Sequence, residues 1–184
     1  MQNEIKKLLE QAGLKPDLID SVVKLLDSFS ASGRFRILKT RAGTGQMLMA
    51  TDWSKNLVVT GNNTGRNLIA QRLGGTNTYS LNITHADIGT GTNTPVNTDT
   101  QLQTPAIRAA LTFVSVVNNV VTLQFFFSDA LLPNGTYTEA GSFVDGSATI
   151  STGQLFNRVL FGTPYVKATA EDTTLEIELN INSA

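Results

Sequence analysis

The sequence contains no cysteine and only one histidine among its 184 residues. The lack of cysteine excludes disulfide bonds, thiolate catalysis and cysteine-ligated metals. A zinc site needs several nitrogen or sulfur ligands, which His85 alone cannot supply. The acidic residues do not form the Asp-rich loop pattern of a calcium site. We therefore expect neither a metal nor another cofactor.

Charge is also scarce, because only 16% of the residues are charged and the formal net charge is −1. Nucleic-acid binding needs concentrated positive charge, so we expect no nucleic-acid partner. Low net charge gives little repulsion between copies, which favours a protein that ends up in an assembly. No apolar run reaches the ~18 residues of a membrane span, and the first residues lack the apolar core of a signal peptide. We expect no membrane partner and synthesis in the cytoplasm.

Catalytic signatures are weak throughout the chain. Gly43-Thr-Gly45 and Gly89-Thr-Gly91 lack the Gly-Lys-(Ser/Thr) ending of a phosphate-binding loop and the third glycine of a dinucleotide-binding turn. No Gly-x-Ser-x-Gly elbow accompanies His85. A carboxylate pair for glycoside cleavage could come from Glu139, Asp145, Glu171 and Asp172, although the sequence does not place them together. The chain is predicted not to be an enzyme, with glycan hydrolysis as the alternative.

Residues 1–33 predict two short amphipathic helices. An apolar stripe with helical spacing runs through Ile5, Leu8, Leu9 and Ala12. The second helix is expected to end at Ser30-Ala-Ser-Gly33, and its apolar face includes Leu25 and Phe29. Helices of this length are unstable alone in water, so they must dock on each other, on the rest of the chain or on another chain. We assign 1–33 to a helical arm and 34–184 to a β-sandwich domain.

The remainder predicts a mainly β fold. Short apolar segments separated by frequent turn signals indicate an antiparallel β-sandwich or a partly closed barrel. The expected strands include 79–83, 107–117, 120–127, 137–144, 149–151, 155–161, 165–168 and 175–182. Asn118-Asn119 is expected to turn a hairpin between two of them. In Phe125-Phe-Phe127 the rings cannot all face one side, so we expect burial on both faces or one ring at an interface.

One short helix is expected near residues 63–73. Asn62-Asn-Thr-Gly65 has helix-start chemistry, and Gly74-Gly75 stops the helix. Its buried stripe is predicted to contain Leu68, Ile69 and Leu73. The segment Arg34–Arg41 carries four basic residues in eight. It is interpreted either as an edge strand protected by Lys and Arg, or as a contact strip for an acidic partner.

Five segments carry a family resemblance. They are Asn63–Gly75; Ile88–Arg108, which begins Ile-Gly-Thr-Gly and continues through a polar loop with proline; Tyr137-Thr-Glu-Ala-Gly-Ser-Phe-Val144; Leu155-Phe-Asn-Arg-Val-Leu-Phe161; and Val166-Lys-Ala168. Together they resemble the small β-rich structural proteins of tailed bacteriophages, and the similarity spans Lys55 to Asn182. Residues 1–33 lie outside it.

The resemblance implies a non-enzymatic virion protein that acts by protein–protein attachment. A tail, collar or baseplate adaptor or fibre component is preferred, and a capsid decoration (cement) protein is the alternative. A third hypothesis is a receptor- or glycan-binding module that stacks sugars on Trp53, Tyr79 or Tyr137. The implied partners are tail, neck or capsid subunits and further copies of the chain, arranged as a trimer or ring. The implied location is the virion, after assembly in the host cytoplasm.

We expect the contact residues to come from the arm, the basic segment and the polar loop. They are Leu8, Leu25, Phe29, Arg34, Arg36, Arg41, Thr90, Thr92 and Asn93. The family motif residues are expected to be fold determinants instead: Gly65, Gly89, Gly91, Arg108, Glu139, Gly141, Phe143 and Arg158. Among these, Glu139 is expected to pair between strands with Arg158 or Arg108.

Overall fold

The computed structural model describes residues 2–18 and 29–183 and divides the chain into two units. The first unit contains helix α1, Gln2–Gln11, and a helical turn at residues 16–18. Gly13 follows α1 with a positive φ of 76°, a conformation that suits the end of a helix. Leu8 is exposed, whereas Leu25 lies outside the described residues. Phe29 begins a strand, and its side chain is not among those described.

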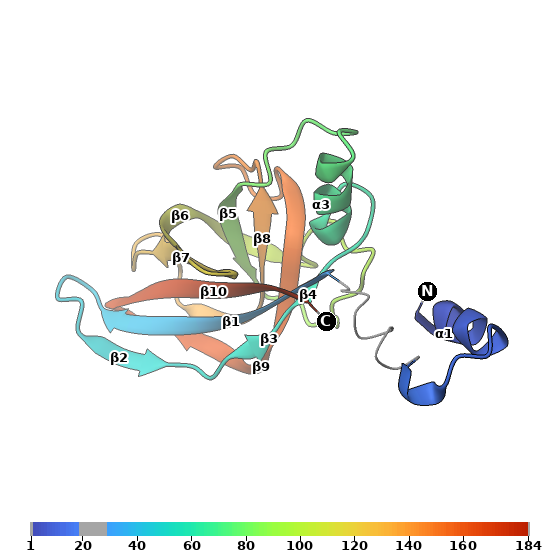
Figure 1. Cartoon of the computed structure of the whole chain (residues 1–184). Coiled ribbons are helices and arrows are strands. Elements are labelled where there is room, and N and C mark those ends of the chain that lie inside the picture. Colours follow the sequence, from blue (N-terminus) through green and yellow to red (C-terminus); the bar gives the residue numbers. More distant parts are fainter. Residues whose placement is uncertain (1, 19–28, 184) are drawn as a thin grey trace. The chain divides into compact units, whose positions relative to one another are not determined.

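The second unit, Ala31–Asn180, is built from one curled antiparallel sheet with a single flanking helix, α3, at Gly65–Leu73 (Figure 1). The strands are β1 Phe29–Arg41, β2 Met47–Ala50, β3 Ser54–Lys55, β4 Leu57–Val58, β5 Ile83–Gly89, β6 Pro105–Val117, β7 Val120–Phe127, β8 Gly135–Val144, β9 Gln154–Lys167 and β10 Glu171–Ser183. Their order across the sheet is β2-β1-β10-β7-β6-β5-β8-β9-β4. The mainly β prediction is therefore confirmed.

A short segment joins the two sides of the sheet. Strand β3 pairs with β1 through Arg34 opposite Lys55, and β4 pairs with β9 through Leu57 opposite Arg158. The chain at Ser54–Val58 thus links β1 to β9, which lie toward opposite ends of the strand order. Of the two predicted architectures, the structure is the partly closed barrel, because all strands belong to one continuous sheet.

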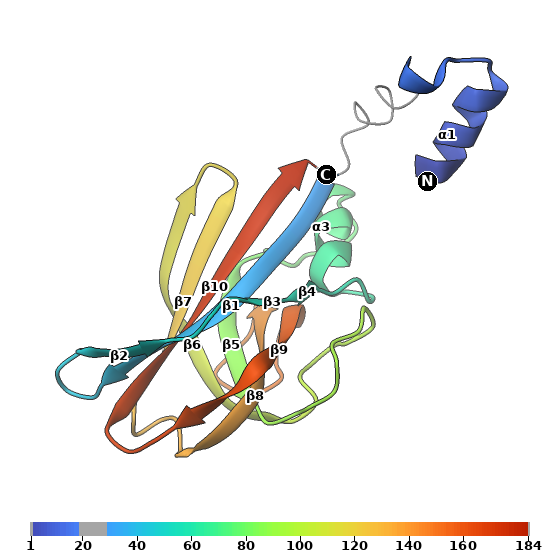
Figure 2. The ribbon, with the colours of Figure 1, turned by 90° about the horizontal axis from the view of Figure 1, so that it is seen from below.

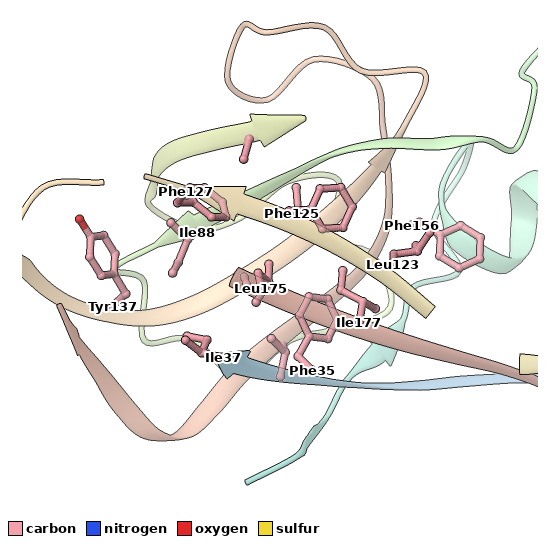
Figure 3. Packing of buried hydrophobic residues seen from close by; sticks show 14 of the residues in the cluster. Phe35, Ile37, Ile88, Leu123, Phe125, Phe127, Tyr137, Phe156, Leu175 and Ile177 are labelled. Atoms are coloured by element: carbon pink, nitrogen blue, oxygen red, sulfur yellow. The ribbon is translucent and has the colours of Figure 1, made fainter. Parts of the chain in front are cut away.

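The interior of the barrel is apolar and receives side chains from strands on opposite walls of the curled sheet (Figure 3). Leu175 and Ile177 on β10 lie opposite Phe125 and Leu123 on β7, and all four are buried. The aromatic triplet divides between the faces, since Phe125 and Phe127 are fully buried whereas Phe126 is 42% exposed. This outcome confirms that the three rings do not share one environment.

Several predicted boundaries are wrong. Strand β1 begins at Phe29, so Ser30–Gly33 extends the sheet and does not cap a helix. Gly33 suits this position because a Cβ there would lie 2.7 Å from Leu179 Cδ2 on β10. Strand β5 starts at Ile83, and the predicted strand at 79–83 is interrupted by Leu81 with a φ of 68°.

Three further expectations need correction. Residues 149–151 form a turn, not a strand. The two strands predicted at 155–161 and 165–168 are one continuous strand, β9. Leu68 is buried and Ile69 packs on the core, but Leu73 is 84% exposed at the end of α3.

Candidate functional site

Glu139 organises the loop that follows β5. It lies on β8, is fully buried, and forms an ion pair with Arg158 Nη2 at 2.8 Å. Its carboxylate also accepts the backbone N–H groups of Gly91 at 3.0 Å and Thr104 at 2.7 Å. Arg158 is one of the two partners expected from the sequence, so that pairing is confirmed. Glu139 fastens both ends of the polar loop to the barrel wall.

The glycines of the Gly-Thr-Gly motif allow this attachment. A Cβ on Gly91 would lie 2.3 Å from the Glu139 carboxylate oxygen Oε1, and one on Gly89 would lie 2.4 Å from the Thr104 carbonyl oxygen. Neither distance leaves room for a side chain. The motif therefore brings the backbone close to a carboxylate, which explains its glycines without any phosphate ligand.

Arg158 holds the middle of the same loop. It donates to Asp99 at 2.6 Å and to the Asn93 carbonyl oxygen at 3.1 Å. The side chains of this loop line a polar hollow of about 580 Å³ that includes Arg158. Thr90, Thr92 and Asn93, the predicted contact residues, lie on the loop and are exposed. The Arg158 guanidinium therefore already has partners within the chain, so it is not a free charge for binding an anion in this hollow.

Arg108 plays an equivalent role at a second loop. Its partner is Asp87 on β5, which accepts from Nη2 at 3.0 Å, and not Glu139. Nη1 donates to the carbonyl oxygens of Ser147, Thr149 and Thr152 at 2.8–3.1 Å. The guanidinium also stacks on the Phe143 ring at 4.5 Å. Arg108 and Phe143 thereby anchor the turn between β8 and β9.

The other motif glycines mark close backbone approaches. Gly65 has a positive φ of 38°, and a Cβ on it would lie 2.1 Å from the Val59 carbonyl oxygen. A Cβ on Gly141 would lie 2.7 Å from Leu102 Cδ1 and 2.8 Å from the Asn157 carbonyl oxygen. Gly65 thus lets the start of α3 lie close to the backbone at Val59, and Gly141 lets Leu102 of the polar loop lie close to β8.

Sequence reasoning missed a third buried cation, Lys167. Its ammonium group is fully buried and pairs with Asp129, while donating to the Ala168 carbonyl oxygen at 2.8 Å. The hydrogen bond from Lys167 lowers the pKa of Asp129 below its usual value. The signal was a lysine at an inward position of strand β9, two residues after the buried Tyr165. Asp87 was also missed, although its position between the buried residues Ala86 and Ile88 was a similar signal.

The acidic residues considered for catalysis have separate partners. Glu139 binds Arg158, Asp145 accepts from the Ser80 N–H at 2.8 Å, and Glu171 pairs with Lys39 at 2.8 Å. Burial, followed by the charge of nearby Arg108, lowers the pKa of His85. Within residues 2–18 and 29–183, no three His, Cys, Asp or Glu side chains form a cluster suited to a metal ion. The residues proposed for glycan cleavage thus each support a local structure.

The basic segment is neutralised within the sheet. Arg34 pairs with Glu178 at 2.9 Å, and Arg36 donates to Glu176 at 2.7 Å. The hydrogen bond from Arg34 lowers the pKa of Glu178. Strand β1 lies between β10 on one side and β2 with β3 on the other, so its interpretation as an edge strand is wrong. Arg41 is exposed and hydrogen-bonds Gln46 at 3.3 Å.

The aromatic residues suggested for glycan stacking make contacts within the chain. Arg34 and Arg36 lie over the Trp53 ring at 4.4 and 4.5 Å. Tyr79 packs against the core, and Tyr137 is buried with its hydroxyl donating to the Pro133 carbonyl oxygen at 2.8 Å. Tyr137 is therefore unavailable to a sugar, whereas Trp53 and Tyr79 are only partly buried, so the glycan-binding hypothesis loses one of its three rings.

An exposed apolar surface lies at the end of the β6–β7 hairpin, here called the hairpin tip, residues 111–121. Figure 2 shows this hairpin, in yellow, projecting beyond β5 and alongside β10. The side chains of the hairpin that are 42–65% exposed are Phe113, Val114, Val116, Val117 and Phe126. No charged residue occurs between Ala109 and Ser128. This uncharged stretch, rich in β-branched residues, was the sequence signal for an exposed apolar surface. From the sequence, only the exposure of one ring of the aromatic triplet at an interface was anticipated.

A second apolar surface lies at strand β2. Met47, Leu48 and Met49 are 39–55% exposed. Beneath them a groove of about 640 Å³ opens between β2 and β9, lined by residues that include Met49, Trp53, Phe161 and Tyr165. The hairpin tip and β2 are therefore the candidate attachment surfaces of the β unit.

The chain matches no protein-family model, and comparisons with curated proteins and with solved structures gave no match. Among the described residues, no helix has the length and apolar character required to cross a membrane.

Proposed function

We propose that this chain is a non-enzymatic structural protein of a phage virion that works by attachment to other virion proteins. The proposal starts from the sequence resemblance to small structural proteins of tailed phages. Its support from the structure is the hairpin tip, an exposed apolar surface without any charge. Contiguous exposed apolar patches of this kind mark protein–protein contacts in soluble proteins.

The roles of the motif residues agree with this proposal. Glu139 with Arg158, and Arg108 with Asp87, each tie a long loop to the barrel. Their polar atoms bind backbone groups of the same chain, so these residues are committed to holding loop shape. Motif residues that hold surface loops in a fixed shape suit a protein that docks on a partner. An enzyme instead needs polar groups that are available to a substrate.

Within the virion, a tail, collar or baseplate adaptor or fibre component is the preferred place. An adaptor needs two separated contact surfaces, one for each neighbour, and the hairpin tip and β2 provide two on different strands. A capsid decoration protein is the alternative, in which the same surfaces would contact adjacent capsomers. Either role implies partners among tail, neck or capsid subunits, and further copies arranged by the symmetry of the particle.

Co-sedimentation tests the proposal. Purified chain is mixed with separated tails and with separated capsids from particles of the encoding phage that lack it. Saturable binding to tails supports the adaptor, and saturable binding to capsids supports decoration. Binding to neither fraction contradicts attachment as the function. Gly91→Ala, which is expected to displace the polar loop, and Leu73→Lys, which changes an exposed residue of α3, serve as a variant pair that separates loop-dependent binding from non-specific adsorption.

A further inference from the structure

One edge of strand β6 is left without a partner at the hairpin tip. On one side, β6 pairs with β7 from Leu111 to Val117. On its other side, pairing with β5 runs only as far as Ala110, which lies opposite His85. A register shift between Leu111 and Phe113 marks the point where β6 leaves the barrel wall. Among the residues that the structure describes, no strand pairs with this outer edge at Phe113–Val117.

This free edge lacks the features that normally protect a strand edge. Exposed edges are usually short, or carry lysine, proline or an inward-pointing charge, because an unprotected edge recruits another strand. Phe113–Val117 contains Phe, three Val and one Ser, with no charge and no proline. The exposed valines point to both faces, since Val114 lies opposite Leu123 on the core side and Val117 lies on the opposite face.

We propose that the free β6 edge pairs with the same edge of a second copy of this chain. The two strands run antiparallel about a two-fold axis at Ser115. This register places Ser115 opposite its counterpart, Val114 opposite Val116, and Phe113 opposite Val117. Each apolar side chain then meets an apolar side chain on the same face, and the two hydroxyl groups face each other, as cross-strand pairing favours.

A second copy fits this edge better than a chain with a charged surface would. The edge carries no charge to select an oppositely charged partner, and it causes no repulsion when it faces itself. At roughly 150–200 Å² for a fully exposed side chain, the exposed fractions of Phe113, Val114, Val116 and Val117 leave on the order of 400 Å² of apolar surface per copy. That area is about half of the roughly 800 Å² that each partner contributes to a standard interface. The paired backbones add to it.

The pairing gives a dimer, which differs from the trimer expected from the sequence, and it leaves β2 as the exposed apolar surface for another virion protein. It does not rest on the proposed function, because it concerns the free chain in solution. Failure to dimerise would leave virion attachment untouched, and failure to bind virion parts would leave the dimer untouched.

Sedimentation equilibrium of the full chain tests the inference, with Val116→Lys as the disrupting variant and Leu73→Lys as the control. Val116 is 65% exposed and Leu73 is 84% exposed, so both lysines are tolerated by the folded monomer, which thermal unfolding verifies. We expect the native chain and the Leu73 variant to have the mass of two chains or a multiple of two. The Val116 variant should dissociate at a protein concentration at least tenfold higher, because it buries an ammonium group against the partner's apolar edge.

Single cysteines test the register, because the native chain has none. In the proposed dimer Ser115→Cys faces itself at the Cα separation of an antiparallel pair, about 4.5–5.5 Å, which suits a disulfide. We expect rapid oxidation of this variant to a covalent dimer, and much slower oxidation of Thr136→Cys, an exposed position on β8. A native monomer, an odd-numbered oligomer, an assembly unaffected by Val116→Lys, or equal oxidation of the two cysteine variants would overturn the inference.

Discussion

Replacement of Glu139 by glutamine tests whether the buried ion pair holds the polar loop. The Glu139 carboxylate is fully buried, and both of its oxygens accept hydrogen bonds. Oε1 accepts from the N–H groups of Gly91 and Thr104, and Oε2 accepts from Arg158 and the Gln103 N–H. A glutamine has one NH₂ group, and in either orientation that group would face donors. No rotation of the amide relieves this conflict.

The magnitude follows from the loss of charge at the buried site. Breaking a buried ion pair from one side costs about 3–5 kcal/mol, because it leaves an uncompensated charge. Arg158 retains Asp99 at 2.6 Å, which places Glu139→Gln at the lower end, about 3 kcal/mol. For a chain of this length the midpoint of thermal unfolding should fall by about 6–12 °C.

Glu178→Gln is the matched control for this experiment. Glu178 also pairs with an arginine at 2.9 Å, but the Arg34 side chain is 45% exposed. A surface pair of this kind contributes less than about 1 kcal/mol. Urea unfolding of both variants and of the native chain measures the difference, and hydrogen exchange at Gly91, Gln103 and Thr104 shows whether the loop opens locally. Equal losses of stability in the two variants would refute the role assigned to Glu139.

Three other outcomes are expected. Gly91→Ala should lower the free energy of unfolding by about 1–3 kcal/mol, because its Cβ would lie 2.3 Å from Glu139 Oε1 and force the loop away. Urea unfolding measures this loss, and an unchanged urea midpoint would contradict the close approach. The pKa values of Glu178 and Asp129 are lower in the folded chain than in the unfolded chain, so their contribution to stability is complete above the unfolded pKa values. This contribution is lost as pH falls through the folded values, so acid unfolding should begin below about pH 4.5. In the double variant Glu178→Gln/Asp129→Asn, stability should depend less steeply on pH in this range. Burial raises the pKa of Tyr165 to about 12, so stability should fall between pH 10 and 12, where this tyrosine ionises in the unfolded chain but not in the folded one. Tyrosinate absorbance measures the pKa, and thermal unfolding of Tyr165→Phe should lose this part of the pH dependence.

Local patterns in the sequence were sufficient for elements whose signals lie within a few residues. Asn118, with a φ of 55°, turns the β6–β7 hairpin where the Asn-Asn pair predicted it. Helix α3 follows the helix-start signal at Thr64 and stops at Gly74, and alternation in β10 places Leu175 and Ile177 in the core. These features depend on turn chemistry and periodicity, which a single sequence displays directly.

The errors arose where distant segments determine the structure. Strand β1 extends back to Phe29 because β10 lies beside it. Leu81 adopts a positive φ near an anchor between Ser80 and Asp145, which no local rule indicates for leucine. The closure of the barrel through Ser54–Val58 depends on two strands far apart in the sequence.

The candidate site was predicted in part for the same reasons. The Glu139–Arg158 pair was anticipated because both residues belong to neighbouring strand motifs, and Glu139 has Leu160 opposite in the register, close to Arg158. The partner of Arg108 was not identified, because Asp87 is on the preceding strand, β5. The free edge of β6 could not be found from its own residues, since it exists only because β5 pairs no further than Ala110.

Quantitative mass spectrometry of density-purified phage particles, from cells that produce the chain, tests whether it is a structural component of a virion. If the proposal is right, the chain is present at a fixed copy number that matches the symmetry of its site and stays constant between preparations. The proposal is wrong if the purified particles lack the chain while abundant chain remains in the lysate.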